Sequence, residues 1–125
     1  MRVLYISGPI KGRDDWTREQ NIRRAEEVAL DVWTLGIVAV CPHALTRFYG
    51  NALPEAVWLR GDLELITRCD GVLAIDGWEY STGARIEVRY AQDKGIPVFL
   101  SVGDVEQAWC QEERSRRQME LPGVN

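Results

Sequence analysis

The sequence predicts a small doubly wound α/β fold, a three-layer sandwich with a parallel sheet of four to five strands. Short apolar runs alternate with stretches whose apolar residues recur at helical spacing, so the order along the chain is β-α-β-α-β-α-β-α. The strand-like runs are apolar throughout, which is typical of sheets covered by helices on both faces. We expect the strand order 2-1-3-4, with the second and third helices side by side on one face.

The first half of the chain contains two predicted strands and one long helix. The apolar run Val3–Ser7 predicts a strand, which the following Gly-Pro pair ends. Between positions 15 and 35 apolar residues recur every three or four positions, which predicts a helix that the next glycine stops. Ile37–Cys41 is predicted to be the second strand, and His43–Asn51 is expected to be a loop.

The second half repeats this alternation. A proline at its start opens a predicted helix over positions 54–69. The fully apolar run Gly71–Ile75 predicts the third strand, and after a turn a serine can cap a helix over Ser81–Lys94. Pro97–Leu100 is the fourth predicted strand, and Asp104–Gln118 the last helix. The whole pattern is that of a flavodoxin- or Rossmann-like sheet, in which ligands bind at the carboxyl ends of the strands.

Length and composition predict one globular domain over residues 1–118, followed by a polar tail over 119–125. The chain has 125 residues, of which 46% are hydrophobic and 27% charged, so it contains enough apolar side chains for a single core. Fifteen Lys and Arg against nineteen Asp and Glu leave a net charge of −4. An acidic chain of this kind lacks the dense basic face that a nucleic-acid polymer needs, although a few local donors suffice for a small anion.

Other residue types bear on metal sites and location. The three cysteines are far apart, no C-x-x-C pair occurs and there is a single histidine, so we expect no metal site and free thiols. No apolar stretch has the length of a signal-peptide core or a membrane span, so we expect a cytoplasmic protein without membrane contact. The chemistry considered below requires no cofactor.

Two acidic residues lie in the middle of apolar helix faces. On a helical wheel Glu87 falls among Ala84, Ile86, Val88, Tyr90 and Ala91, and Asp62 falls within the apolar face of the helix over 54–69. An unpaired buried carboxylate is costly, so each must either bond to backbone amides or an arginine, or serve in a site. Each lies about 9–12 Å from the ligand end of its helix, so the two are expected to line one cavity. Carboxylates in apolar pockets act as acids, bases and nucleophiles.

The remaining candidates fit a phosphate and a base. The turn Gly8-Pro9-Ile10-Lys11-Gly12-Arg13 offers backbone amides and two cations, although an ordinary solvated turn has the same composition. Ser81 and Gly83 open the helix that carries Glu87, and a helix N-terminus attracts anions, while simple capping by the serine is compatible with this role.

Three aromatic or basic residues complete the candidate site. Tyr5 can reach a carboxylate in the cavity or belong to the core. His43 at a strand end is either a base-side residue or an ordinary loop histidine. Trp78, in the turn after the third strand, is the tryptophan expected near a base. Trp109 is expected to be exposed on the last helix, where it would suit contact between subunits.

Taken together, these segments resemble the nucleoside 2-deoxyribosyltransferase superfamily, including its small phage and bacterial members. The resemblance covers about residues 3–100 and is carried by four motifs: Tyr5-Ile6-Ser7-Gly8-Pro9-Ile10, Arg60-Gly61-Asp62-Leu63, Cys69-Asp70-Gly71-Val72 and Ser81-Thr82-Gly83-Ala84-Arg85-Ile86-Glu87. It implies that Glu87 is the nucleophile that attacks C1′ of the sugar. It also implies that Asp62 contacts the substrate and assists proton transfer, and that Tyr5 orients the nucleophile.

The position six residues before the glutamate separates branches of this superfamily. Transferases that act on free nucleosides tend to have aspartate there, whereas this chain has Ser81, as does the branch similar to 2′-deoxynucleoside 5′-monophosphate N-glycosidases. A serine can donate a hydrogen bond to a 5′-phosphate that an aspartate would repel. Lys11 and Arg13 fit that branch, and Pro9 departs from it, because a phosphate-binding serine is frequent at this position.

The expected function is therefore cleavage of the N-glycosidic bond of a 2′-deoxyribonucleotide, a 5′-monophosphate, through a covalent glycosyl–Glu87 intermediate that releases the free base. Deoxyribosyl transfer between bases uses the same residues and stays open. So does a non-catalytic nucleotide-binding or sensing module, and an interaction protein is a third reading. The resemblance also implies a homodimer or higher homo-oligomer with a small nucleotide or nucleoside as ligand.

Overall fold

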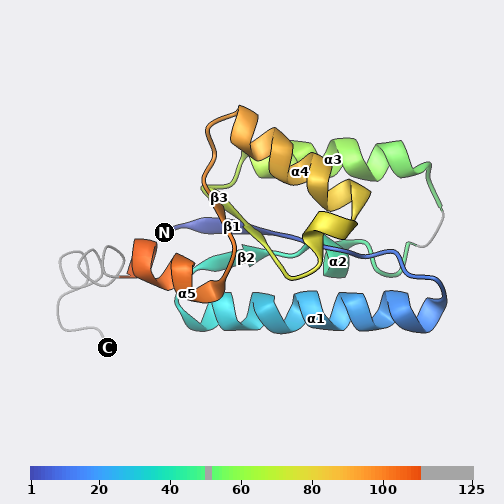
Figure 1. Ribbon diagram of the computed structural model, residues 1–125, viewed down its shortest axis with the longest axis horizontal. Coiled ribbons are helices and arrows are strands. Elements are labelled where there is room, and N and C mark those ends of the chain that lie inside the picture. The colour runs from blue at the N-terminus through green and yellow to red at the C-terminus, as the bar shows by residue number, and fades with distance from the viewer. Residues whose placement is uncertain (50–51, 111–125) are drawn as a thin grey trace.

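The computed structural model of the protein describes residues 1–49 and 52–110 (Figure 1). The elements along the chain are the strand β1 (Val3–Ser7), the helix α1 (Asp15–Thr34), the strand β2 (Val38–Val40), the helices α2 (Pro42–Leu45) and α3 (Glu55–Thr67), the strand β3 (Gly71–Ala74), the 3₁₀ helix η1 (Trp78–Tyr80), the helix α4 (Thr82–Asp93), the strand β4 (Val98–Phe99), the helix α5 (Val102–Val105) and the π-helix η2 (Glu106–Cys110).

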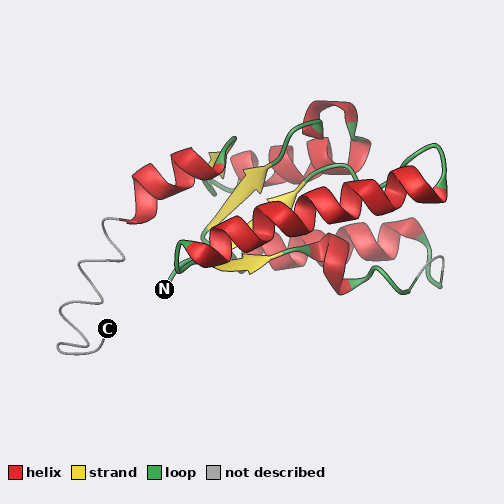
Figure 2. Ribbon diagram, turned by 90° about the horizontal axis from the view of Figure 1, so that it is seen from below, coloured by secondary structure: helices red, strands yellow, loops and turns green. Residues whose placement is uncertain are grey.

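The sheet confirms the doubly wound α/β fold. Four parallel strands lie in the order β2-β1-β3-β4, which is the predicted order. The helices α3 and α4 cover one face of this sheet, and α1 and α5 cover the other (Figure 1). Seen from below, α1 runs across the sheet in front of the strands (Figure 2). The molecule is thus a three-layer sandwich of the Rossmann-like type, with four strands.

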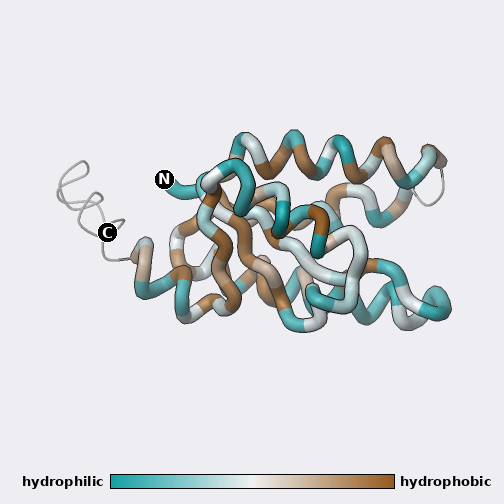
Figure 3. The backbone as a smooth tube through the Cα atoms, turned by 45° about the horizontal axis from the view of Figure 1, so that its top comes forward, coloured by the Kyte–Doolittle hydropathy of each residue, from teal (hydrophilic) through white to brown (hydrophobic). Residues whose placement is uncertain are grey.

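The core divides into two clusters because successive strand residues point to opposite faces of the sheet. Leu4 and Ile6 of β1 pack with α1, α5 and η2, whereas Tyr5 faces Ile66 of α3 and Ala91 of α4. The hydrophobic colour accordingly concentrates on the strands, and hydrophilic residues alternate with it along the outer helices (Figure 3). Tyr5 is therefore a fully buried residue whose hydroxyl is carried on the α3–α4 side.

Glycine follows two of the predicted helices, those that became α1 and α4. Gly36 and Gly95 follow the last turns of α1 and α4, and both have positive φ angles, of 83° and 73°. Glycine adopts this left-handed conformation without the steric cost that a Cβ atom brings. Within residues 1–49 and 52–110, no helix combines the length and apolar character required to cross a membrane.

Two sequence expectations are corrected by the structure, and a third lies partly outside the described residues. The segment expected to be a loop from His43 begins with the short helix α2, because Pro42 occupies the first helical turn. The last helix begins at Val102 rather than Asp104, since Ser101 accepts a hydrogen bond from the Asp104 amide and caps it. From residue 111 on, the rest of this predicted helix and the predicted tail over 119–125 lie outside the described residues.

Trp109 was expected to be exposed and is 5% exposed. Its ring meets Phe99 edge-to-face with centroids 5.0 Å apart, and Arg2 lies over it at 5.4 Å. The third strand makes room for this ring, because a Cβ atom at Gly71 would lie 2.8 Å from Trp109 Cη2. The absence of a side chain at Gly71 is thus a packing requirement of the layer formed by α5 and η2.

We expect Gly71→Ala to lower the free energy of unfolding by about 1–3 kcal/mol, because the added methyl group overpacks the Trp109 ring. Gly61→Ala is the matched control. Gly61 lies inside α3, and a Cβ atom there would meet nothing within 4 Å in the described part of the chain. Alanine at an exposed helix interior should raise stability by about 0.5–1 kcal/mol. Urea unfolding of both variants measures the two effects, and equal midpoints would contradict the packing role of Gly71.

Candidate functional site

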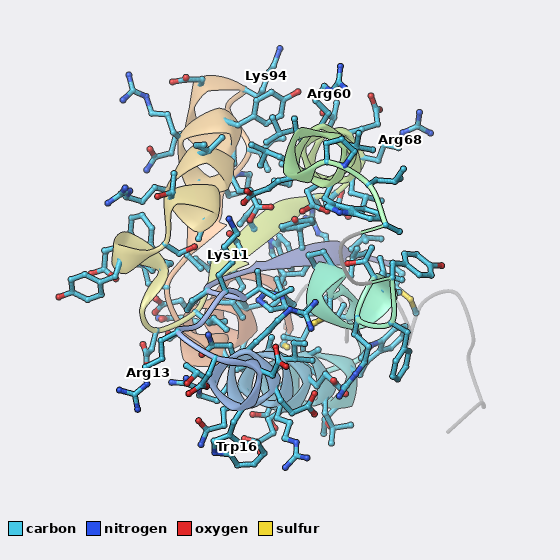
Figure 4. All side chains as sticks on the ribbon, turned by 90° about the vertical axis from the view of Figure 1, so that its right-hand side faces the viewer. Lys11, Arg13, Trp16, Arg60, Arg68 and Lys94 are labelled. Carbon is cyan, nitrogen blue, oxygen red and sulfur yellow. The ribbon has the colours of Figure 1, made fainter. Side chains whose placement is uncertain are left out.

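A cavity of about 330 Å³ opens at the carboxyl ends of β1 and β2. Its wall is built by the turn after β1, by α1 and α2 on one side, and by α3 and the first turn of α4 on the other. Figure 4 looks at the molecule from this end, and Lys11 of the turn lies near the centre of the view. The cavity therefore lies where ligands bind in doubly wound sheets.

The acidic residue Glu87 of α4 lies in this cavity wall and is 6% exposed. Two hydroxyl groups of β1 hold it: Tyr5 donates to Oε2 at 2.6 Å and Ser7 donates to Oε1 at 2.7 Å. Burial raises the pKa of Glu87, while the hydrogen bonds from these hydroxyls favour its ionised form. Each carboxylate oxygen keeps a further lone pair for a ligand.

Asp62 of α3 lines the same cavity. Burial, and after it the charge of Glu87, raise the pKa of Asp62 to about 7. The charge of Glu87 acts on Asp62, so near neutral pH the two carboxyl groups favour a single negative charge between them. The Tyr5 and Ser7 hydroxyls stabilise that charge on Glu87, which leaves Asp62 as the group that takes up a proton. The pKa of Tyr5 is raised by burial and by Glu87, which keeps its phenol protonated as a donor.

The turn after β1 is held from behind by Asn21 of α1. The Asn21 side chain is 6% exposed and its Nδ2 donates to the Lys11 carbonyl at 3.1 Å and to the Ile10 carbonyl at 3.4 Å. Its Oδ1 in turn accepts from Arg24 at 2.6 Å. With both carbonyls bonded to the helix behind them, the conformation of this turn is fixed before any ligand arrives.

The structure separates the three cations near this turn. Lys11 lines the cavity mouth and forms a 2.5 Å ion pair with Glu55 at the start of α3. Arg13 is 89% exposed and does not line the cavity, and Pro9 and Gly12 also lie outside its wall. Gly8 and Ile10 do line it. The third cation, Arg18 of α1, lines the cavity and was not singled out from the sequence.

His43 of α2 lies in the cavity wall and is 3% exposed. Its Nε2 lies 3.0 Å from the Pro9 carbonyl oxygen. Because a carbonyl only accepts, Nε2 carries the hydrogen, and burial lowers the pKa of the ring, so the imidazole is neutral. His43 therefore connects α2 to the turn after β1 whatever else it contacts.

The first turn of α4 brings Ser81, Gly83 and Ala84 to the cavity. The Ser81 hydroxyl accepts from the Ala84 amide at 3.2 Å, which confirms it as the helix cap. Trp78 is not among the residues that line the cavity, whereas Trp58 of α3 is. Residues 1–49 and 52–110 hold no group of three His, Cys, Asp or Glu side chains placed to bind a metal ion.

Sequence reasoning missed Ser7, Asn21 and Arg18, although two of them carry the signal that revealed the acidic pair. Arg18 and Asn21 lie four residues before Ile22 and Ala25, respectively, so both share the buried face of α1. A polar residue on an apolar helix face marks the cavity wall in α1 as it does in α3 and α4. In the opposite sense, Ile86 was placed on the apolar arc of α4 and is 39% exposed.

We expect Asp62→Asn to stabilise the protein more at high pH than at low pH. The ordinary carboxyl pKa is 3.8 and that of folded Asp62 is about 7, so between these values the folded state binds an extra proton. The free energy of unfolding therefore falls as the pH rises from about 4 to about 7 and then levels off, and asparagine removes that loss along with the repulsion of Glu87. Thermal unfolding from about pH 5 to about pH 8 measures the difference.

Glu64→Gln is the control for this series, since Glu64 lies on the exposed face of the same helix in a surface ion pair with Arg68. It should leave the pH dependence of unfolding as in the wild type. A pH-independent gap between Asp62→Asn and the wild type would show that Asp62 is ionised throughout this range.

Comparisons with known proteins bear on the fold and the family. A conserved protein from Enterococcus faecalis V583, known from its crystal structure, is similar with a TM-score of 0.57 and 21% sequence identity over 98% of this chain and 77% of that chain. At this identity the likeness concerns the fold. No curated protein matches the chain. Residues 2–100, which include every element from β1 to β4, match the family described as Domain of unknown function (DUF4406), and the chain belongs to this family.

Proposed function

We propose that the protein cleaves the N-glycosidic bond of a 2′-deoxyribonucleotide, a 5′-monophosphate, and releases the free base. The observation that carries the proposal is the buried Glu87 carboxylate, held by the Tyr5 and Ser7 hydroxyls in the same cavity as Asp62, whose pKa is raised. An oriented anion next to an acid of raised pKa is the pair that glycoside cleavage uses. The resemblance of the motifs around Tyr5, Asp62 and Glu87 to the nucleoside 2-deoxyribosyltransferase superfamily supports the same assignment.

In the first step a Glu87 oxygen attacks C1′ and the bond from C1′ to the base nitrogen breaks. The electron pair of that bond goes to the base, and Asp62 gives its proton to a ring nitrogen. In the second step the Asp62 carboxylate takes a proton from water, whose oxygen attacks C1′ and releases Glu87. The products are the base and 2-deoxyribose 5-phosphate. A second base in place of this water would give transfer, so the two reactions differ in what reaches the intermediate.

The phosphate is assigned to the first turn of α4. There Ser81 and Gly83 line the cavity, and the helix dipole favours an anion. Lys11 reaches the same cavity mouth and can exchange its exposed partner Glu55 for a phosphate, because an exposed ion pair contributes little. Arg13, which points away from the cavity wall, is left without a role in binding.

Glu87→Gln tests the mechanism. Glutamine keeps the shape of the side chain, and its amide oxygen still accepts a hydrogen bond from one of the two hydroxyls. Because an amide oxygen is a poor nucleophile, the rate of base release should fall by at least about 10³-fold. Asp93→Asn, at the exposed end of the same helix, should keep full activity. The assay follows free base by chromatography from deoxy- and ribonucleosides and their 5′-monophosphates, with and without a second base.

The outcomes of this assay separate the candidate functions. Release of free base from a monophosphate by wild type, and its loss in Glu87→Gln, would support the glycosidase. A new nucleoside that forms only when a second base is added would identify a transferase instead. Wild-type turnover retained in Glu87→Gln would rule out the covalent mechanism. Thermal stabilisation by nucleotides without any product would identify a binding module.

The proposal includes a homodimer or higher homo-oligomer acting in the cytoplasm. Trp109 is buried and therefore cannot contact another subunit. The apolar side chains that support self-association are instead Leu45, Phe48 and Tyr49, which are 56%, 88% and 57% exposed. Light scattering after size exclusion should give a multiple of the 14.2 kDa chain mass. Phe48→Ser should lower that multiple, and a wild-type monomer would contradict the assembly.

A further inference from the structure

The cavity has two flanks, because β1 lies between β2 and β3 in the sheet. Glu87 is hydrogen-bonded to Tyr5 and Ser7 of β1 and so marks the middle. The segment after β3 leads into α4, whose first turn forms one flank. The segment after β2 is α2, whose His43 forms the other flank together with Thr46 just beyond it.

Arg18 belongs to the α2 flank. It lines the cavity from α1, is partly buried, and its charge acts on His43. Neighbouring arginines are paired: Arg24 with Asn21, Arg23 with Glu19, and Arg47 with Glu19 and Glu26. The Arg18 guanidinium, by contrast, has neither an ion pair nor a hydrogen bond to any side chain in residues 1–49 and 52–110. Among the described residues, Arg18 is the arginine that lines the cavity, and its guanidinium is available to a ligand.

The proposed function fixes which part of the ligand this flank meets. In a deoxyribonucleotide, C1′ and C4′ lie on either side of the ring oxygen, so the base and the 5′-phosphate extend from opposite ends of the sugar. With C1′ at Glu87 and the phosphate at the first turn of α4, the base points to the flank of His43, Thr46 and Arg18. The contact with Arg18 is therefore a contact with the edge of the base.

The hydrogen-bonding groups of this flank select the base. His43 Nε2–H is used on the Pro9 carbonyl, and the Thr46 hydroxyl donates to the Pro42 carbonyl at 3.3 Å. Arg18 supplies the free donors, and a guanidinium is a pure donor that pairs best with two adjacent acceptors. Guanine and hypoxanthine offer O6 and N7 in that arrangement, whereas adenine has an amino group beside N7.

We propose that Arg18 binds the O6/N7 edge of a 6-oxopurine, so that the protein prefers deoxyribonucleotides of guanine and hypoxanthine to that of adenine. This inference rests on the proposed function. The positive charge also stabilises the negative charge that develops on the base as the C1′–N9 bond breaks. Ring nitrogen N3, which lies next to the sugar, is left for the Asp62 proton.

The test compares wild type, Arg18→Met and Arg18→Lys on dGMP, dIMP and dAMP, with circular dichroism to confirm folding. Wild type should show a kcat/KM for dGMP and dIMP at least about 10-fold above that for dAMP, the range expected for a bidentate contact. Arg18→Met should abolish this ratio, and Arg18→Lys should keep part of it, because an ammonium lacks the fork. The matched control is Arg23→Met on the exposed side of α1, which should leave the ratio unchanged.

A substrate change makes the same test from the ligand side. The 7-deaza analogue of dGMP lacks the N7 acceptor and is also an intrinsically poorer leaving group. Its loss of kcat/KM relative to dGMP should therefore be larger in wild type than in Arg18→Met, in which only the leaving-group effect remains. A guanine-to-adenine ratio that survives in Arg18→Met would overturn the assignment. So would an Arg18→Met defect that is equal for all bases and confined to 5′-monophosphates, since that pattern identifies a phosphate ligand.

Calorimetric binding of dGMP and dAMP to Glu87→Gln, with and without Arg18→Met, separates this inference from the proposed function. Arg18-dependent preference for dGMP in binding, with no base release by wild type, would retain the base contact and reject the glycosidase. Base release by wild type without an Arg18-dependent preference would retain the glycosidase and reject the base contact. Binding of neither nucleotide, together with no base release, would reject both.

Discussion

The site depends on the pair of hydrogen bonds that fix the buried Glu87 carboxylate to β1. A carboxylate in the apolar interface between α4 and the sheet is unfavourable on its own, and the Tyr5 and Ser7 hydroxyls provide the donors that make it tolerable. These bonds also set the position of α4 relative to the central strand. Asp62 can then keep a proton near neutral pH, because it is itself partly buried and because the negative charge of the pair is already on Glu87.

Much of this could be predicted from local sequence. Apolar runs without alternation identify strands buried on both faces, and the order of elements then gives the sheet topology. Asp62 and Glu87 could be predicted because an acidic residue in the middle of an apolar helix face is recognisable from a single sequence. Asn21 and Arg18 occupy equivalent places on α1, but arginine and asparagine near a helix start are common on solvated surfaces, so the same pattern carries less weight there.

Other features depend on contacts that no local pattern contains. The ion pair of Lys11 joins residues more than forty positions apart and gives this cation an exposed partner that a ligand must displace, whereas Arg18 has no such partner among the described residues. Trp109 is buried because Gly71, in another strand, leaves room for its ring. Trp58 rather than Trp78 lines the cavity, because α3 forms part of the cavity wall whereas no residue of η1 does. Such outcomes follow from packing across the whole chain.

The placement of the tryptophans has a spectroscopic consequence. Trp58 lies in the cavity wall, Trp109 lies behind the sheet in the opposite layer, and Trp16 and Trp33 are 58% and 52% exposed on α1. Ligand quenching of intrinsic fluorescence is therefore expected from Trp58, over a background from the exposed Trp16 and Trp33. The red shift on denaturation comes from Trp109, with smaller contributions from the partly buried Trp58 and Trp78. Occupancy of the site and integrity of the fold can thus be followed in the same cuvette as separate signals.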